Sequence, residues 1–474
     1  ATSKTIGYTG RAYLRFTQSF KKPTAAPTAE GEEQKDETNT IQNAFYSVQA
    51  DYQRDYNSVQ DPNHKMDPFK YGYVGKFVEQ YEPEYAASVD TASGGKTAIR
   101  LLGYMPTGVD YERAELNPLL ANYTSAYYDL GGEAPLLLSN VQAAGAYLRN
   151  GDGPNATYSL WSNVGQPQTG FNKAQADQFS LGVDASFDYK MRKATHAIEF
   201  GLYYQQRSER FYGVNGAGLW QLMRLLTHRV VPFSELDYGN PTYVVGGKKY
   251  TKQDILSGAV MLSPYDTVIY DRVFNDSAAV VGGFDYNLRQ KLGLNVRGRD
   301  YLQPDAYDPS MYSLDMFTAD ELLNNGASLV NYYGYDYTGN IVTGQVNFDD
   351  FWKQKDANGN YTRPIGAYRP NYLAGYISDN IRFKDILFTI GVRVERFDNN
   401  TKVLKDPYNL YAGRSAGQVE GRLNALNGGA HPDNIGDDYA VYVNDNASSS
   451  PSIIGYRNGD VWYDANGREI SDPF

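Results

Sequence analysis

The sequence predicts an all-β protein whose strands form part of a large antiparallel transmembrane β-barrel. Three observations lead to this fold class. Apolar and polar residues alternate, the alternating arms exceed ten residues, and long segments rich in Gly, Asn, Asp, Pro and Tyr separate them. Strands of soluble sheets usually have about five or six residues, whereas a tilted membrane-crossing strand needs about nine to eleven. Arm length therefore favours a membrane-spanning sheet over a soluble sandwich.

The first predicted strand covers residues 5–20 and has one apolar and one polar face. Arg11 and Arg15 lie on the polar face, where a dry core would have to supply each with a buried partner. The next alternating run, residues 44–56, places Asp51 at a polar position. A wide barrel with a polar, water-filled lumen accommodates such charges. We therefore expect Arg11, Arg15 and Asp51 to face a lumen.

Two hairpins continue the pattern. In residues 177–213 the apolar positions of both arms fall on one face, and the basic turn 190–193 reverses the chain. In residues 376–400 the charged tetrapeptide 382–385 separates two arms. The second arm places Ile386 to Val394 on the apolar face and Arg393 and Glu395 on the face predicted to line the lumen. In the first arm, Tyr376 and Ile377 are both apolar and adjacent, so the pattern does not decide which of them lies on the apolar face.

The connections are expected to sort by length. Residues 190–195, 382–385 and, less tightly, 57–69 are short and are predicted to lie at one rim. The long segments 82–176, 213–368 and 398–474 then lie at the opposite, extracellular rim. Loops of this size are rare in compact soluble domains, whereas outer-membrane barrels combine short turns at one rim with long loops at the other.

The long segments should contain short helices. Residues 216–231 place Leu219, Met223 and Leu226 at helical spacing, and Thr318 followed by Glu321 predicts a helix N-terminus. Aromatic residues in these segments are the candidate ligand contacts, although the tyrosines equally suit the core of the loop itself. These candidates are Trp220, Tyr332, Tyr333, Tyr335 and Tyr337.

Composition argues against other classes of protein. The net charge is −11, from 44 Lys+Arg against 55 Asp+Glu, so no nucleic-acid partner is expected. The sequence contains no run of 18 apolar residues, so no transmembrane helix is predicted. The chain has no cysteine, its four histidines form no metal motif, and residues 356–360 fit a turn better than a calcium loop. We therefore predict no catalytic residue, cofactor or metal site, and no enzymatic activity.

Several stretches together resemble the barrel portion of TonB-dependent receptors of the Bacteroidota type. They are GRAYLRF (10–16), YGYVGKF (71–77), DMFTADELLNNG (315–326), NYYGYDYTG (331–339) and, most specifically, the hairpin within residues 369–411. Members of this family have a plug inside a 22-stranded outer-membrane barrel. Six spanning strands, or eight with weaker runs, are recognisable here. Residues 1–474 are thus expected to be a segment of one barrel domain, with the plug and closing strands outside it.

The resemblance implies a location in the cell outer membrane, with the long loops extracellular. It implies capture of a ligand such as a glycan or another nutrient, and import driven by the TonB-ExbB-ExbD system through the plug. Outer-membrane lipid and lipopolysaccharide would surround the barrel, and a surface lipoprotein is a further candidate partner. Two alternatives stay open: a non-energised surface receptor or accessory barrel of a secretion or gliding machine, and a secreted soluble all-β glycan-binding protein.

Overall fold

The chain divides into two compact units, residues 1–400 and 401–474. The computed structural model describes residues 3–20, 40–90, 95–128, 149–153, 167–191, 193–228, 234–270, 272–274, 280–296, 300–411, 413–419, 430–448 and 451–471. Strands are the main regular structure in both units, and they pair antiparallel except where β10 runs parallel to β4. The predicted predominance of antiparallel β-structure is therefore confirmed.

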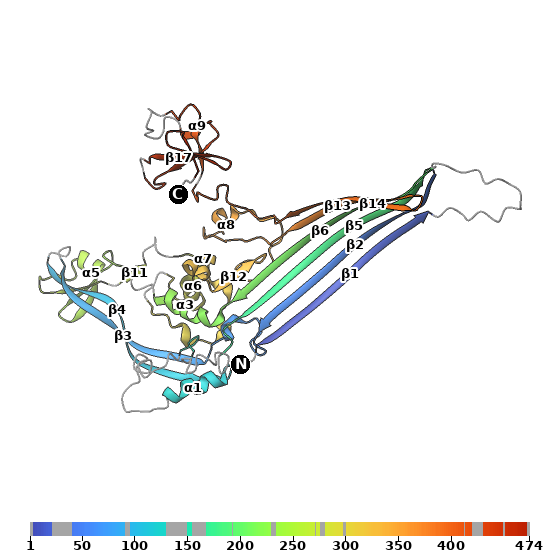
Figure 1. The fold of residues 1–474 in the computed structure, drawn as a ribbon. Coiled ribbons are helices and arrows are strands. Elements are labelled where there is room, and N and C mark those ends of the chain that lie inside the picture. Colours follow the sequence, from blue (N-terminus) through green and yellow to red (C-terminus); the bar gives the residue numbers. More distant parts are fainter. Residues whose placement is uncertain are drawn as a thin grey trace, which may run out of the picture. The chain divides into compact units, whose positions relative to one another are not determined.

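The first unit is built on a sheet of long strands that lie side by side (Figure 1) in the order β1-β2-β5-β6-β13-β14, with β12 beside β6. These strands are β1 (Lys4–Phe20), β2 (Thr40–Gln60), β5 (Phe171–Lys190), β6 (Thr195–Val214), β13 (Asn371–Phe383) and β14 (Ile386–Asp398). The first four have 17 to 21 residues. All six predicted strands are confirmed. β1 and β14 are the edges, and the described residues do not close the sheet.

Three connections join strands at one end of this sheet, which we call the turn end. The β13–β14 turn consists of Lys384 and Asp385 alone, because Phe383 already pairs with Ile386. It is tighter than the predicted 382–385, and Lys384 has the positive φ (52°) typical of such turns. The β5–β6 turn, residues 191–194, is also at this end. The ends of β1 and β2 that are connected in sequence lie there too, since Phe20 pairs with Ala44 and Thr40 with Lys190.

The prediction that residues 57–69 lie at the turn end is wrong. Residues 57–60 continue β2, where Val59 pairs with Asn172, and Asn172 with Gly213. The connection after β2 therefore lies at the opposite end. The polar residues Asn57, Ser58 and Gln60 resemble a connector in sequence, although they are strand residues. Connection length consequently does not separate the two ends of the sheet, because the long connection from β1 to β2 joins strand ends at the turn end.

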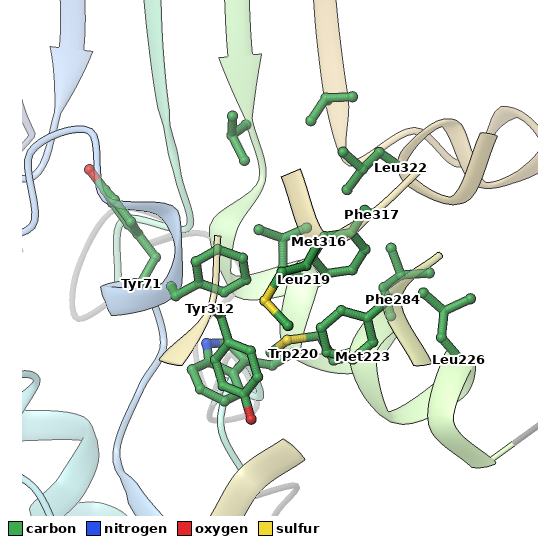
Figure 2. Close-up of a cluster of buried hydrophobic side chains, with 14 of the residues drawn as sticks. Tyr71, Leu219, Trp220, Met223, Leu226, Phe284, Tyr312, Met316, Phe317 and Leu322 are labelled. Atoms are coloured by element: carbon green, nitrogen blue, oxygen red, sulfur yellow. The ribbon is translucent and has the colours of Figure 1, made fainter. Parts of the chain in front are cut away.

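The opposite end carries a packed assembly of short elements, which we call the lobe (Figure 1). Its elements are η1 (Pro68–Lys70), α3 (Gly216–His228), α6 (Phe284–Lys291), η3 (Pro304–Ala306), η4 (Pro309–Met311), η5 (Leu314–Met316), α7 (Ala319–Leu323), η6 (Asn324–Gly326) and β12 (Val330–Tyr333). Figure 2 shows its core, in which Phe284 stacks on Phe317 at 4.5 Å between ring centroids. The strand ends Phe171 and Val214 join the same core. The predicted helix with Leu219, Met223 and Leu226 on one face is confirmed as α3, and all three are buried.

One carboxylate holds the start of two lobe helices. Thr318 caps α7 by accepting a hydrogen bond from Glu321 N, as predicted, and the Glu321 carboxylate accepts from Thr318 N at 2.8 Å. The same carboxylate accepts from Phe284 N, the first residue of α6, at 3.1 Å. Burial raises the pKa of Glu321, and its backbone hydrogen bonds oppose that rise. The local cap was visible in sequence, whereas the contact with α6 was not.

Glu321→Ala should lower the free energy of unfolding by about 2 kcal/mol, because it removes a cap and leaves buried amides without an acceptor. Because the pKa of Glu321 is higher in the folded than in the unfolded protein, its protonation stabilises the fold at pH values below the unfolded-state pKa. This contribution to the free energy of unfolding is lost as pH rises through the folded-state pKa. The difference between wild type and variant should therefore be larger at about pH 5 than at about pH 7. Denaturant titration at both pH values measures it. Asp254→Ala, in the exposed Thr251–Asp254 capping box, is the matched control and should have the smaller effect. Equal effects would contradict the role of Glu321 in joining two helices.

The predicted loop 82–176 contains most of a long hairpin, which corrects that prediction. Its strands are β3 (Gly75–Asp90) and β4 (Lys96–Arg113), followed by α1 (Pro118–Tyr128). The pairing shifts register at Gln80/Tyr81 and Glu84/Tyr85. Each shift interrupts the two-residue alternation, and Pro83 is a residue disfavoured in strand interiors. The sequence therefore lacks the regular alternation from which β3 and β4 could be predicted. The remaining short elements of this unit are β7 (Ser234–Leu236), β8 (Thr242–Val245), β9 (Lys248–Thr251), α5 (Lys252–Leu256), β10 (Thr267–Tyr270), β11 (Arg272–Phe274) and α8 (Asp350–Lys353).

The second unit falls in the predicted loop 398–474 and instead forms a small antiparallel sheet in chain order. Its elements are β15 (Arg414–Ser415), α9 (Ala416–Val419), β16 (Ala440–Val443), β17 (Ile453–Asn458), β18 (Val461–Asp464) and β19 (Glu469–Ile470). Val419, Ile435, Val441 and Tyr456 are buried in its own core. This segment therefore has a hydrophobic core where a loop was expected.

Candidate functional site

Register across the six long strands places the alternating residues on two continuous faces. Val392 of β14 pairs with Ile377 of β13, and Ile377 pairs with Phe200 of β6. Phe200 pairs in turn with Ala185 of β5, and Ala185 with Tyr46 of β2. Directly paired residues project to the same side of a sheet. The apolar positions of all six strands thus form one surface, the apolar face, and the intervening residues form the polar face.

The apolar face is exposed despite its large hydrophobic side chains. Leu202 is 64% exposed, Ile390 62% and Val394 68%. Contiguous apolar surface on this scale marks an interaction with a membrane or another protein. The register also settles the two residues that the sequence left open. Ile377 lies on the apolar face, and the Tyr376 hydroxyl donates to Asp184 Oδ1 at 2.9 Å on the polar face.

The length of the apolar face along β5 can be compared with the apolar band of outer-membrane barrels. On β5 the apolar positions run from Phe179 to Tyr189, about ten residue steps or roughly 33 Å along the strand. With the strand tilt of about 40° found in outer-membrane barrels, this length corresponds to about 25 Å, the height of their apolar band. Aromatic residues occupy both limits, with Tyr52 beside Phe179 near the lobe and Phe20 and Tyr189 near the turn end.

The residues predicted to face a lumen all lie on the polar face. They are Arg11, Arg15, Asp51, Arg393 and Glu395. Arg15 Nε donates to Ser47 Oγ at 2.9 Å, and Arg393 pairs with Glu395 and donates to the Tyr372 hydroxyl at 3.1 Å. Their grouping on one face is confirmed. Whether this face lines a water-filled lumen stays a prediction.

The apolar face also carries a histidine–aspartate pair near the turn end. His196 Nδ1 lies 2.7 Å from Asp379 Oδ2, and both side chains are mostly buried. His196 follows the β5–β6 turn directly, as the second residue of β6. The contact gives His196 Nδ1 and Asp379 Oδ2 a polar partner on a largely apolar surface. Within the described ranges, no group of three or more His, Cys, Asp or Glu residues could hold a metal ion.

The structure places the candidate ligand contacts in and beside the lobe core. Trp220, Tyr332 and Tyr335 are buried, whereas Tyr333 and Tyr337 are half-buried. The Tyr332 hydroxyl donates to the Arg363 carbonyl at 2.8 Å, and the Lys173 ammonium lies 4.5 Å from the Tyr335 ring. The burial of Tyr332 and Tyr335 matches the alternative that the tyrosines build the loop's own core. Ligand contact stays a prediction for all five residues.

A buried polar network in the lobe was missed by the sequence analysis. Arg224 Nη1 of α3 donates to both Asp305 carboxylate oxygens, at 3.0 and 3.1 Å, and to the Asn150 carbonyl at 3.0 Å. Arg224 Nη2 lies 3.5 Å from Asp152 Oδ1, and the side chains of Arg224, Asp152 and Asp305 are buried. These residues are far apart in sequence. The single local signal is an arginine inside the apolar run of α3.

A small pocket adjoins this network. It has an empty volume of about 220 Å³ and is lined by Phe77, Glu79, Arg149, Arg224, Tyr301, Gln303, Pro304 and Asp305. Burial raises the pKa of Glu79, and the positive charge of Arg149 opposes that rise. Small-molecule sites usually have about 300 to 1,000 Å³. This pocket therefore does not by itself provide a site for a nutrient-sized ligand.

No protein-family model, no curated protein and no solved structure matches this chain. No helix in the described part of the chain is both long and apolar enough to cross a membrane. What the protein does is therefore inferred from its own residues and their geometry.

Proposed function

We propose that this chain forms part of the barrel of an outer-membrane TonB-dependent transporter. The lobe lies outside the cell and takes part in capturing a ligand. A plug outside this chain, moved by the TonB-ExbB-ExbD system, then opens a path along the polar face. The exposed apolar face of the six-stranded sheet is the observation that carries the proposal.

Lipid supplies the contact that this face lacks in the described structure. In water, each exposed Leu, Ile or Phe side chain forgoes about 1.5–3 kcal/mol of burial, so a soluble sheet would cover such a surface. The band height, the flanking aromatic residues and the charged opposite face all fit a wide barrel. β1 and β14 expose unpaired backbone at the sheet edges, which hydrocarbon does not tolerate. Further strands therefore complete the barrel.

Exposed aromatic rings offer a surface for ligand capture. Phe348 is 61% exposed and Trp352 56%. The guanidinium group of Arg363 lies 5.6 Å from the Trp352 ring and 4.3 Å from the Tyr361 ring. Such rings stack on the apolar faces of sugars and other flat ligands. Phe348 and Trp352 are therefore better placed than the buried Tyr332 and Tyr335 to meet a glycan directly.

Residues 1–474 contain no cysteine, which allows a direct test of membrane insertion. Val183→Cys and Asp184→Cys place one thiol on each face of β5 at the same height. In bilayer-embedded protein, a water-soluble maleimide should label Asp184→Cys and leave Val183→Cys unmodified until detergent dissolves the bilayer and denaturant unfolds the protein. Labelling is measured by mass spectrometry. Equal labelling of both positions in the bilayer would refute a membrane-spanning sheet and would favour the soluble glycan-binding alternative.

Uptake in the encoding bacterium separates energised transport from a non-energised receptor. Loss of TonB should abolish ligand uptake to the same extent as loss of this protein, while binding of the ligand to the cell surface persists. Radiolabelled candidate glycans or other nutrients supply the measurement. Uptake that is unaffected by loss of TonB would reject the transporter and leave the receptor or accessory-barrel alternative.

A further inference from the structure

Two arginines lie on the apolar face just beyond its apolar band, at the end next to the lobe. Arg54 Nε of β2 donates to Asp177 Oδ1 of β5 at 2.6 Å, and Arg210 Nη1 of β6 donates to Asp177 Oδ2 at 2.6 Å. We call Arg54, Asp177 and Arg210 the rim cluster. Asp177 precedes Phe179 by two residues, so the cluster begins about 7 Å past the row of Tyr52 and Phe179. The stacked Tyr8–Tyr56 pair lies on the same face, one row further toward the lobe than Arg54.

The rim cluster carries a net positive charge, and Arg54 is its solvent-exposed member. Asp177 also accepts hydrogen bonds from the Tyr52 hydroxyl at 2.7 Å and from Gln175 Nε2 at 2.9 Å, which fixes its position. One carboxylate thus orients two guanidinium groups and leaves a net charge of about +1 on the cluster. The Arg54 side chain is 49% exposed, so part of its guanidinium group is free to meet an anion.

Among the described strand residues, the lysines and arginines of the apolar face gather at this end. Lys4, Lys173 and Arg396 share the face and the lobe end with Arg54 and Arg210. Toward the turn end, the described strand residues of the same face include neither lysine nor arginine, and their charged groups are the His196–Asp379 pair. The two limits of the apolar band therefore differ in charge, and only the lobe end attracts anions.

We propose that the rim cluster binds the phosphate group of an anionic lipid in the outer leaflet. This inference rests on the proposed membrane-spanning role of the sheet. Guanidinium groups bind phosphate oxygens bidentately, and the adjacent apolar positions Val48, Ala50 and Leu181 offer a surface for acyl chains. An amphiphile with a phosphate head and an apolar tail matches both surfaces at once. Asp177 is the positioning residue, because it holds both arginines.

Retention of diphosphoryl lipid A by the full chain tests the proposal. Protein is reconstituted into phosphatidylcholine vesicles containing a minority of lipid A and re-extracted into neutral detergent, and co-purifying lipid A is quantified by mass spectrometry. Arg54→Gln should retain about fivefold less lipid A than wild type, the loss expected for one arginine near an anionic surface. Arg11→Gln removes the same charge from the polar face and should match wild type. Arg54→Lys keeps the positive charge but removes the bidentate guanidinium group, so its lipid A retention should lie between those of wild type and Arg54→Gln.

The outcomes separate the lipid site from its alternatives. Equal retention by wild type and Arg54→Gln would overturn the proposal, provided that both show the same circular dichroism spectrum. If Arg54→Gln misfolds, Arg54→Lys provides the test instead. Lipid A retention by Arg54→Lys equal to that of wild type would then count against bidentate binding of phosphate by the Arg54 guanidinium group. Displacement of lipid A by millimolar inorganic phosphate would identify a free-anion site and overturn the lipid assignment. If lipid A retention does not depend on Arg54 but Val183→Cys stays unlabelled by maleimide in the bilayer, the membrane-spanning proposal remains intact. Labelling of Val183→Cys in the bilayer would reject the membrane-spanning proposal itself.

Discussion

Ile390→Arg should cost about 2–4 kcal/mol of unfolding free energy in a bilayer, whereas Thr389→Arg should be close to neutral. The two residues are adjacent on β14, and both are exposed. Ile390 is on the apolar face, where an arginine would enter hydrocarbon. Thr389 is on the polar face, where its hydroxyl donates to Asn380, and water could solvate the new charge.

Equilibrium unfolding in lipid vesicles, followed by tryptophan fluorescence, measures both free energies. The comparison is internally controlled, since each variant adds the same side chain to the same strand. In a soluble sheet, both substitutions would replace exposed residues and would change stability by less than about 0.5 kcal/mol. Equal and small effects would therefore count against the membrane-spanning sheet, independently of cysteine labelling.

Arg224→Met should lower the free energy of unfolding by about 3–5 kcal/mol, because it breaks a buried ion pair from one side. Asp305 and Asp152 would then lie in the lobe without their main cationic partner. Burial already raises the pKa of Asp152, and the charge of Arg224 opposes that rise. Removal of Arg224 should thus push Asp152 toward its neutral form and loosen the contacts between α3 and residues 149–153 and 304–306.

Denaturant unfolding monitored by tryptophan fluorescence suits this variant, since Trp220 lies one turn from Arg224 on α3. Arg113→Met is the matched control. Its ion pair with Glu115 is solvent-accessible, so the expected loss is below about 1 kcal/mol. Adding Asp305→Leu to Arg224→Met should recover part of the stability, because replacing both charges is less harmful than stranding one. A loss for Arg224→Met as small as for Arg113→Met would show that the network contributes little to the lobe.

Local patterns predicted local features correctly. The Thr318 cap, the buried stripe of α3 and the turn at 356–360 depend on a few neighbouring residues, and the structure confirms each. Patterns failed where a distant segment intervened. Bulges hid β3 and β4, and pairing with β5 extended β2 through residues that look like a connector.

The sequence by itself determined that long two-faced strands exist and which residues of each strand share a side, because backbone geometry alone sets the period of two. Only the tertiary structure decided which strands are neighbours, and so joined their apolar sides into one exposed face with arginines at one limit. It also decided that Tyr332 and Tyr335 are buried and that Arg224 meets Asp305. The physical reason is that burial and ion pairing depend on contacts between residues far apart in the chain, which no local pattern contains.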